Sequence, residues 1–76
     1  MLTQNQNNVL EFIAGSIRSG GIPPSIYEVS NGTGLGYNIV RFAMMDLEKL
    51  GFIKRHFNKP RAISVLKWPN KMKDAA

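Results

Sequence analysis

The sequence predicts an α+β fold in which three helices are followed by a two-stranded β-hairpin. Apolar residues recur at helical spacing in three separate stretches of the first 50 residues. Two short β-prone runs follow, and they flank a four-residue segment that is basic and contains a proline. The chain has 76 residues, which is enough for one compact domain with a small core but not for two domains.

The first helix is predicted over residues 4–19. Thr3 precedes it as a plausible N-cap, because its hydroxyl can accept a hydrogen bond from a free backbone N–H. The tandem glycines Gly20 and Gly21 end the helix. Its apolar stripe, with Phe12 at the margin, consists of Val9, Leu10, Ile13, Ala14 and Ile17.

The second helix is short and is predicted over residues 26–32. Pro23 and Pro24 force an extended entry into it. Ser25 and Glu28 have the spacing of a capping box, in which each side chain bonds the backbone N–H of the other residue. Two apolar residues are expected to face inward: Ile26 and Val29.

The third helix is predicted over residues 37–50, after the turn Gly34-Leu35-Gly36 and before Gly51. Its expected buried stripe consists of Val40, Ala43, Met44, Leu47 and Leu50. The opposite face carries Tyr37, Asn38, Arg41, Met45, Glu48 and Lys49. Leu47 and Leu50 are expected to anchor this helix to the core, which leaves its polar face exposed.

The β-hairpin is predicted from two runs, residues 52–57 and 62–66, joined by the basic tip Asn58-Lys59-Pro60-Arg61. Phe52 and Ile53 are expected to connect the hairpin to the helical core. We expect the folded domain to cover residues 1–67, and residues 68–76 to form a flexible basic tail.

The charge is concentrated in the second half of the chain. The net charge is +5, with ten Lys and Arg against five Asp and Glu. Residues 1–40 carry a net charge of −1, and residues 41–76 carry +6. A small domain with this imbalance favours a polyanionic partner, because Lys and Arg gain affinity by displacing counterions from phosphates. The alternative is an ordinary solubilising basic tail.

Several classes of site are excluded by composition. The absence of cysteine excludes a disulfide scaffold, cysteine-ligated zinc and thiol catalysis. His56 is the single histidine, so we expect no metal site. Asp46 and Glu48 are two residues apart on a helix and point in different directions, so they do not form an acid–base pair. We therefore expect no enzymatic activity, no cofactor and no small-molecule ligand.

No membrane association is expected. No apolar run approaches the ~18 residues that span a bilayer, and the polar N-terminus lacks the character of a signal peptide. We therefore expect a cytoplasmic, nucleoid-associated protein.

Three helices followed by a basic hairpin is the element order of a winged helix-turn-helix. Three sets of residues make this pattern more specific. In the second half of the chain they are Thr33-Gly34-Leu35, Val40 and Leu47-Glu48-Lys49-Leu50-Gly51-Phe52-Ile53. Those in the first half are Leu2-Thr3, Gln6, Val9, Ile13, Ile17, Gly21, Pro23-Pro24-Ser25 and Glu28-Val29. The last segment is Arg61-Ala62-Ile63-Ser64-Val65-Leu66. Together they resemble the N-terminal DNA-binding domain of the LexA repressor family over about residues 2–66.

The resemblance implies that the start of the third helix enters the DNA major groove. Matched residue by residue, the base-contacting positions are Gly36, Asn38, Ile39, Arg41 and Phe42, and Tyr37 is added as a neighbouring contact. Asn can bond an adenine edge bidentately, and Arg can bond guanine in the same way. The acidic residues common in the family at positions 41 and 42 are absent, so the operator sequence does not carry over.

The DNA backbone is expected to be held by a second group of residues. Ser25 begins a helix whose free N–H groups can bind a phosphate. The wing is suited to phosphate or minor-groove contact. Its expected contact residues are Lys54, Arg55, Asn58, Lys59 and Arg61.

The predicted function is that of a sequence-specific, double-stranded DNA-binding transcriptional regulator, a repressor, with two copies on a palindrome or direct repeat. The sequence ends at Ala76, so we expect a stand-alone regulator without the family's self-cleaving protease domain. Two alternatives stay open. One is a DNA-architectural or recombination accessory protein of a mobile element. The other is a winged-helix protein–protein adaptor that uses Phe42 and Met45 without DNA.

Individual side chains also have simpler structural interpretations. Asn38 can stabilise the first turn of its helix. Arg41 can pair with a neighbouring surface carboxylate. Tyr37, Phe42 and Met45 can be half-buried packing residues or an exposed apolar surface.

Overall fold

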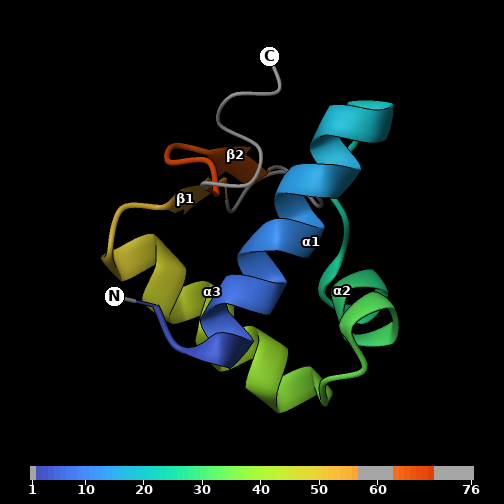
Figure 1. Cartoon of the computed structure of the whole chain (residues 1–76), viewed down its shortest axis with the longest axis vertical. Coiled ribbons are helices and arrows are strands. Elements are labelled where there is room, and N and C mark those ends of the chain that lie inside the picture. The colour runs from blue at the N-terminus through green and yellow to red at the C-terminus, as the bar shows by residue number, and fades with distance from the viewer. Residues whose placement is uncertain (1, 57–62, 70–76) are drawn as a thin grey trace.

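The computed structural model describes residues 2–56 and 63–69. It contains α1 (Gln4–Gly20), α2 (Ile26–Thr33) and α3 (Tyr37–Lys49), followed by strands β1 (Ile53–Arg55) and β2 (Ile63–Val65). Helix α1 runs through the middle of the domain, with α2 on one side and the strands on the other (Figure 1). The element order confirms the predicted α+β, winged helix-turn-helix fold.

The core lies mainly between α1 and α3. Helix α2 and each of the two strands contribute one buried residue to it. Every member of the predicted α1 stripe except Ile17 is buried, and Ile17 packs against the core from its edge. The buried cluster consists of Val9, Leu10, Ile13, Val29, Val40, Ala43, Met44, Leu47, Ile53 and Ile63. A fully buried aliphatic side chain of this kind stabilises a fold by about 1.5–3 kcal/mol, so the buried stripe of α3 fixes which of its faces remains outside.

Both predicted N-caps are confirmed as capping boxes. The Thr3 hydroxyl accepts a hydrogen bond from the Gln6 N–H at 3.1 Å, and the Thr3 N–H donates to Gln6 Oε1 at 3.0 Å. The Ser25 hydroxyl accepts from the Glu28 N–H at 3.2 Å, and the Ser25 N–H donates to Glu28 Oε1 at 2.8 Å. Each box satisfies backbone donors that the first turn of a helix leaves unpaired.

The turn between α2 and α3 is held by side chains of α2. Gly34 caps α2 with φ of 76°, a left-handed conformation that glycine adopts without a steric penalty. The Ser30 hydroxyl donates to the Leu35 carbonyl at 2.6 Å. The Thr33 hydroxyl donates to the Val29 carbonyl at 2.7 Å and accepts from the Leu35 N–H at 3.3 Å. These bonds fix the start of α3 relative to α2.

The prediction that Leu50 belongs to the buried stripe is wrong. Helix α3 ends at Lys49, and Leu50 is the C-cap residue with half of its surface exposed. The Gly51 N–H donates to the Glu48 carbonyl and the Phe52 N–H to the Leu47 carbonyl, which is a Schellman ending. This ending reverses the chain, so Phe52 and Ile53 take the inner positions that a longer helix would have given to Leu50.

The strands are antiparallel, and among the described residues they leave out 52, 56 and 66 of the predicted runs. Ile53 pairs with Val65, Lys54 with Ser64 and Arg55 with Ile63. Ile53 is buried and Phe52 packs on the core, as expected. The Phe52 carbonyl accepts hydrogen bonds from the N–H groups of Leu66 and Lys67, which holds the end of the hairpin against the helices. The predicted tip, residues 58–61, lies outside the described residues, as do residues 70–76 of the predicted tail.

Candidate nucleic-acid interface

The outer face of α3 carries the residues that were predicted to read bases. Gly36 is the N-cap and provides no side-chain hydrogen bond to the helix. Asn38 and Arg41 are exposed, on the side opposite the buried stripe. Three apolar or aromatic residues share this surface: Tyr37 (40% exposed), Ile39 (46%) and Phe42 (56%). The fold therefore brings all six predicted base-reading positions to one exposed surface.

The simpler interpretations of Asn38 and Arg41 find no support within the described residues. The Asn38 side chain forms no hydrogen bond there, so it does not cap the first turn. The Arg41 guanidinium lies 5.6 Å from the centre of the Phe42 ring, a cation–π contact. The two carboxylates of α3 are engaged elsewhere: Asp46 accepts from Gln6 at 3.1 Å, and Glu48 pairs with Arg55.

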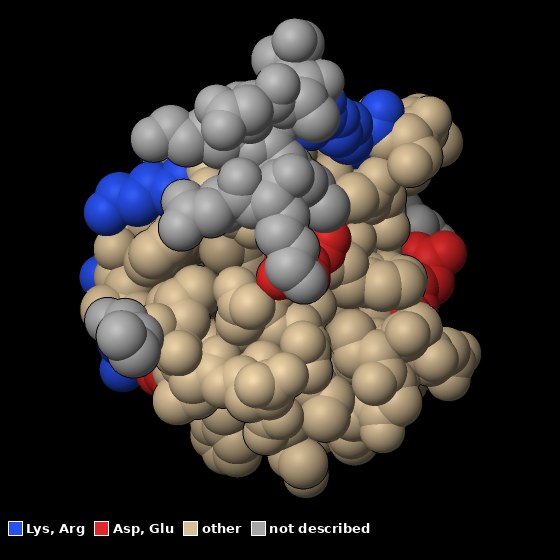
Figure 2. Space-filling view, in the orientation of Figure 1, with Lys and Arg blue, Asp and Glu red and all other residues tan. Residues whose placement is uncertain are grey.

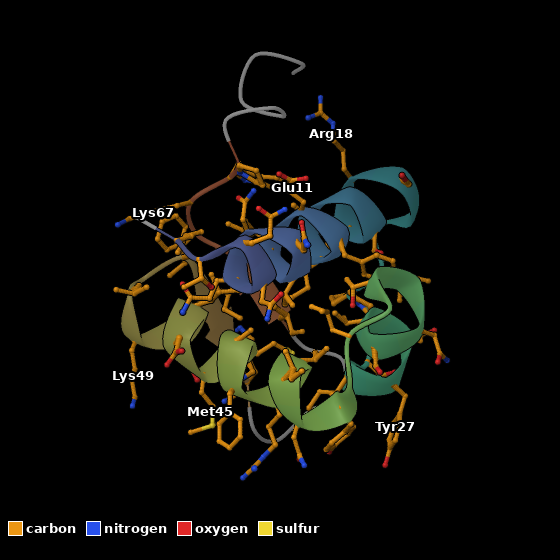
Figure 3. All side chains as sticks on the ribbon, turned by 60° about the horizontal axis from the view of Figure 1, so that its bottom comes forward. Glu11, Arg18, Tyr27, Met45, Lys49 and Lys67 are labelled. Carbon is orange, nitrogen blue, oxygen red and sulfur yellow. The ribbon has the colours of Figure 1, made fainter. Side chains whose placement is uncertain are left out.

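Tyr27 is an exposed aromatic that the sequence analysis did not select. It is 68% exposed on the first turn of α2, and its ring lies 5.0 Å from the ring of Tyr37, centre to centre. In Figure 3 it points away from the domain on the same side as Met45 and Lys49 of α3, whereas Arg18 points to the opposite side. The sequence contained a signal for this exposure: Tyr27 lies in the first turn of α2, after the Ser25 cap and before the buried Val29.

Phe42 and Met45 differ in burial. Phe42 is largely exposed, and Met45 is half-buried. The sequence left open whether these residues pack inside or form an exposed apolar surface, and the two differ. Phe42 belongs to the exposed surface of α3, whereas Met45 is half-buried beside it without belonging to the buried core cluster.

The wing cations have unequal surroundings. Lys54 is exposed on β1. Arg55, its neighbour, points to the other face of the strand, where its Nε and Nη2 atoms donate to Glu48 Oε1 at 3.2 and 3.1 Å. Its backbone N–H also reaches Glu48, at 3.4 Å. Arg55 therefore ties β1 to α3, a role that the sequence analysis did not foresee. Asn58, Lys59 and Arg61 lie outside the described residues.

Charged side chains are unevenly distributed on the face shown in Figure 2. Lys and Arg side chains appear along its upper part and left edge, and its lowest part, in the region of α3, shows no charged group. The candidate interface therefore combines apolar and polar side chains of α3 with the Arg41 guanidinium on the same surface, and Lys49 adds an exposed cation in the last turn of the helix. Such a combination suits a duplex groove bordered by phosphates.

Comparison with known proteins places the chain in a family. The sequence model of the LexA DNA binding domain matches residues 1–62. The chain belongs to the LexA DNA-binding domain family. The match includes α1, α2, α3 and β1, so it confirms the resemblance seen in the sequence.

Three LexA repressors illustrate the likeness. The chain is 45% identical over 69 residues to that of Pelotomaculum thermopropionicum, a match that covers 90% of this chain and 34% of the relative. It is 41% identical over 66 residues to that of Caldicellulosiruptor saccharolyticus, covering 86% and 33%. It is 37% identical over 70 residues to that of Corynebacterium diphtheriae, covering 91% and 30%. The chain thus spans about a third of the length of these relatives.

Two further findings concern other kinds of site in this LexA-family domain. Within residues 2–56 and 63–69, no three His, Asp or Glu side chains come together in a way that could hold a metal ion. Over the same part of the chain, no helix has the length and hydropathy needed to cross a membrane.

Proposed function

We propose that this protein is a sequence-specific double-stranded DNA-binding repressor that inserts the outer face of α3 into the major groove. The observation that carries the proposal is the pair of exposed polar side chains, Asn38 and Arg41, on the surface opposite the buried stripe of α3. Neither side chain is hydrogen-bonded within the described residues, so their donors can meet base edges without breaking an existing hydrogen bond. The family membership and the LexA repressors that resemble the chain support the same reading.

The groups around α3 are suited to hold the phosphate backbone. The first turn of α2, capped by Ser25, presents backbone N–H groups at the positive end of the helix dipole. Tyr27 and Tyr37 add two phenol groups beside it, and Lys54 adds an exposed cation from the wing. Such contacts set the register of the protein on the duplex, whereas Asn38 and Arg41 read the sequence.

Two copies are expected to bind one operator. One helix in the groove reads only a few base pairs, so a specific site needs two half-sites about 34 Å apart, or a multiple of that distance. The domain extends 31 × 27 × 23 Å along its principal axes, dimensions comparable with this spacing. Occupation of a promoter by such a pair would repress transcription by excluding polymerase.

The test is selection of bound duplexes from a random pool, followed by titration of the best duplex with wild-type protein and variants. Asn38→Ala and Arg41→Ala are expected to weaken binding by about tenfold or more each, and to relax the preference at one base pair each. Arg18→Ala is the matched control, since it removes a cation from the side opposite Tyr27 (Figure 3). Unchanged affinity and preference in both α3 variants would refute base reading by this surface.

A further inference from the structure

The apolar side chains on the outer face of α3 do not contribute to the core. Ile39 is 46% exposed and Phe42 is 56% exposed, although buried positions lie next to both in the helix. Leaving hydrocarbon of this size in water is unfavourable, and grouped exposed apolar residues usually mark a contact surface. Asn38 and Arg41 lie beside them on the same face, so any ligand that covers one pair also meets the other.

The chemistry of this surface narrows what it can recognise. The first turn of α3 contains no acidic residue, and the helix's two carboxylates are engaged by Gln6 and Arg55. The surface therefore offers an amide, a guanidinium and two hydrocarbon groups. In the major groove of DNA, the one hydrocarbon group that an unmodified base pair presents is the C5 methyl of thymine.

We propose that Phe42 and Ile39 read thymine C5 methyl groups, so that the preferred duplex carries thymine at defined positions beside the bases read by Asn38 and Arg41. This inference rests on the proposed function and specifies the base class that the site selects. The cation–π contact between Arg41 and Phe42 supports it, because it holds a guanidinium and a hydrocarbon ring side by side. That combination suits a groove in which base methyl groups lie among phosphates and acceptor atoms.

A protein partner is the other ligand that an apolar surface suggests. It fits these residues less well, because a docking patch for protein is expected to be apolar at its centre and depleted of charge. Here the Arg41 guanidinium lies over the ring of Phe42, 5.6 Å from its centre, so the exposed apolar surface itself carries a charge.

The experiment replaces each thymine of the selected duplex, one at a time, with deoxyuridine. This substitution removes one methyl group and keeps the base pair. At one or more positions, wild-type protein should bind about fourfold more weakly, as expected for the loss of one buried methyl group. Binding is measured by fluorescence anisotropy at fixed salt.

Variants assign the effect to residues. Phe42→Ala, checked for an unchanged melting temperature and helix content, should bind the thymine and uracil duplexes equally at the position that Phe42 reads. Leu50→Ala is the matched control, since Leu50 is also half-exposed but lies at the other end of α3, and this variant should keep the full fourfold difference. Ile39→Val offers a milder second variant if Phe42→Ala proves unstable, and it should lower the uracil penalty at a different position.

The outcomes separate this inference from the function on which it rests. If the protein selects a duplex but every uracil substitution changes affinity less than twofold, the methyl-reading inference is wrong and DNA recognition stands. If Phe42→Ala and Ile39→Val keep the full uracil penalty, the assignment to these side chains is wrong. If no duplex is selected and a protein partner is retained instead, both the inference and the proposed function fail.

Discussion

Gly32 of α2 lies directly against the phenyl ring of Phe12 in α1. A Cβ atom at residue 32 would overlap the Cε2 and Cζ atoms of the ring and would lie 2.8 Å from its Cδ2 atom. The ring is partly buried and packs on the margin of the core. The absence of a side chain at Gly32 therefore sets how closely α2 approaches α1, and with it the position of the α2–α3 unit.

We expect Gly32→Ala to destabilise the fold by about 1–3 kcal/mol through overpacking, although alanine is the better helix former. Gly20→Ala is the matched control, since a Cβ at Gly20 would meet nothing within 4 Å, and it should be neutral or slightly stabilising. Chemical denaturation measures both. Equal stabilities of the two variants would show that the Phe12 ring adapts at no cost.

The two capping boxes provide a test that separates stability from binding. Thr3→Ala and Ser25→Ala should each lower the free energy of unfolding by about 1 kcal/mol, because each leaves a first-turn N–H unpaired. Only Ser25→Ala should weaken DNA binding further at a temperature where both variants are folded, since the α2 cap is the proposed phosphate site. Equal DNA affinity of the two variants would remove the Ser25 side chain from the interface.

The contact between Glu48 and Arg55 should stabilise the attachment of the wing to α3. A double-mutant cycle with Glu48→Gln and Arg55→Ala should give a coupling free energy of about 1 kcal/mol, because the pair is partly buried and makes two side-chain hydrogen bonds. Thermal or denaturant unfolding measures it. A coupling near zero would mean that the pair is no better than an ordinary surface ion pair.

Salt dependence should distinguish the two neighbouring wing cations. Lys54→Ala should lower the slope of log affinity against log salt by about 0.9, the value for one phosphate contact. Arg55→Ala should lower it by less, since Glu48 already balances the Arg55 charge. If both variants lower the slope by the same amount, the result would show that Arg55 gives up its ion pair with Glu48 when DNA binds.

Tyr27→Phe should weaken DNA binding about tenfold without changing stability, because it removes a phenol that we expect to bond a phosphate but keeps the ring beside Tyr37. Tyrosine at this position is 68% exposed, so its loss should not disturb the core. Anisotropy titration checks the affinity, and circular dichroism checks the fold. An unchanged affinity would show that the aromatic pair is only a packing contact between α2 and α3.

The sequence by itself determined the element order, both N-caps and the buried stripes of α1 and α3, apart from Leu50 and the edge residue Ile17. These features depend on residues within a few positions of one another, such as Ser25 and Glu28, and local spacing reports them directly. It also indicated which face of α3 stays exposed, since that face is the complement of the buried stripe. The proposed base-reading surface follows from that same periodicity.

The tertiary structure decided the contacts between elements, because these depend on how the helices cross and where the chain reverses. The Schellman ending of α3 turned Leu50 outward, although the helical spacing had predicted it to be buried. The same reversal brought Arg55 to Glu48, and the short α2–α3 turn brought Tyr27 to Tyr37. No local sequence pattern predicts the Glu48–Arg55 and Tyr27–Tyr37 contacts. Each of these side chains could equally well be exposed to water on its own helix or strand, so its partner is decided only when the elements pack together.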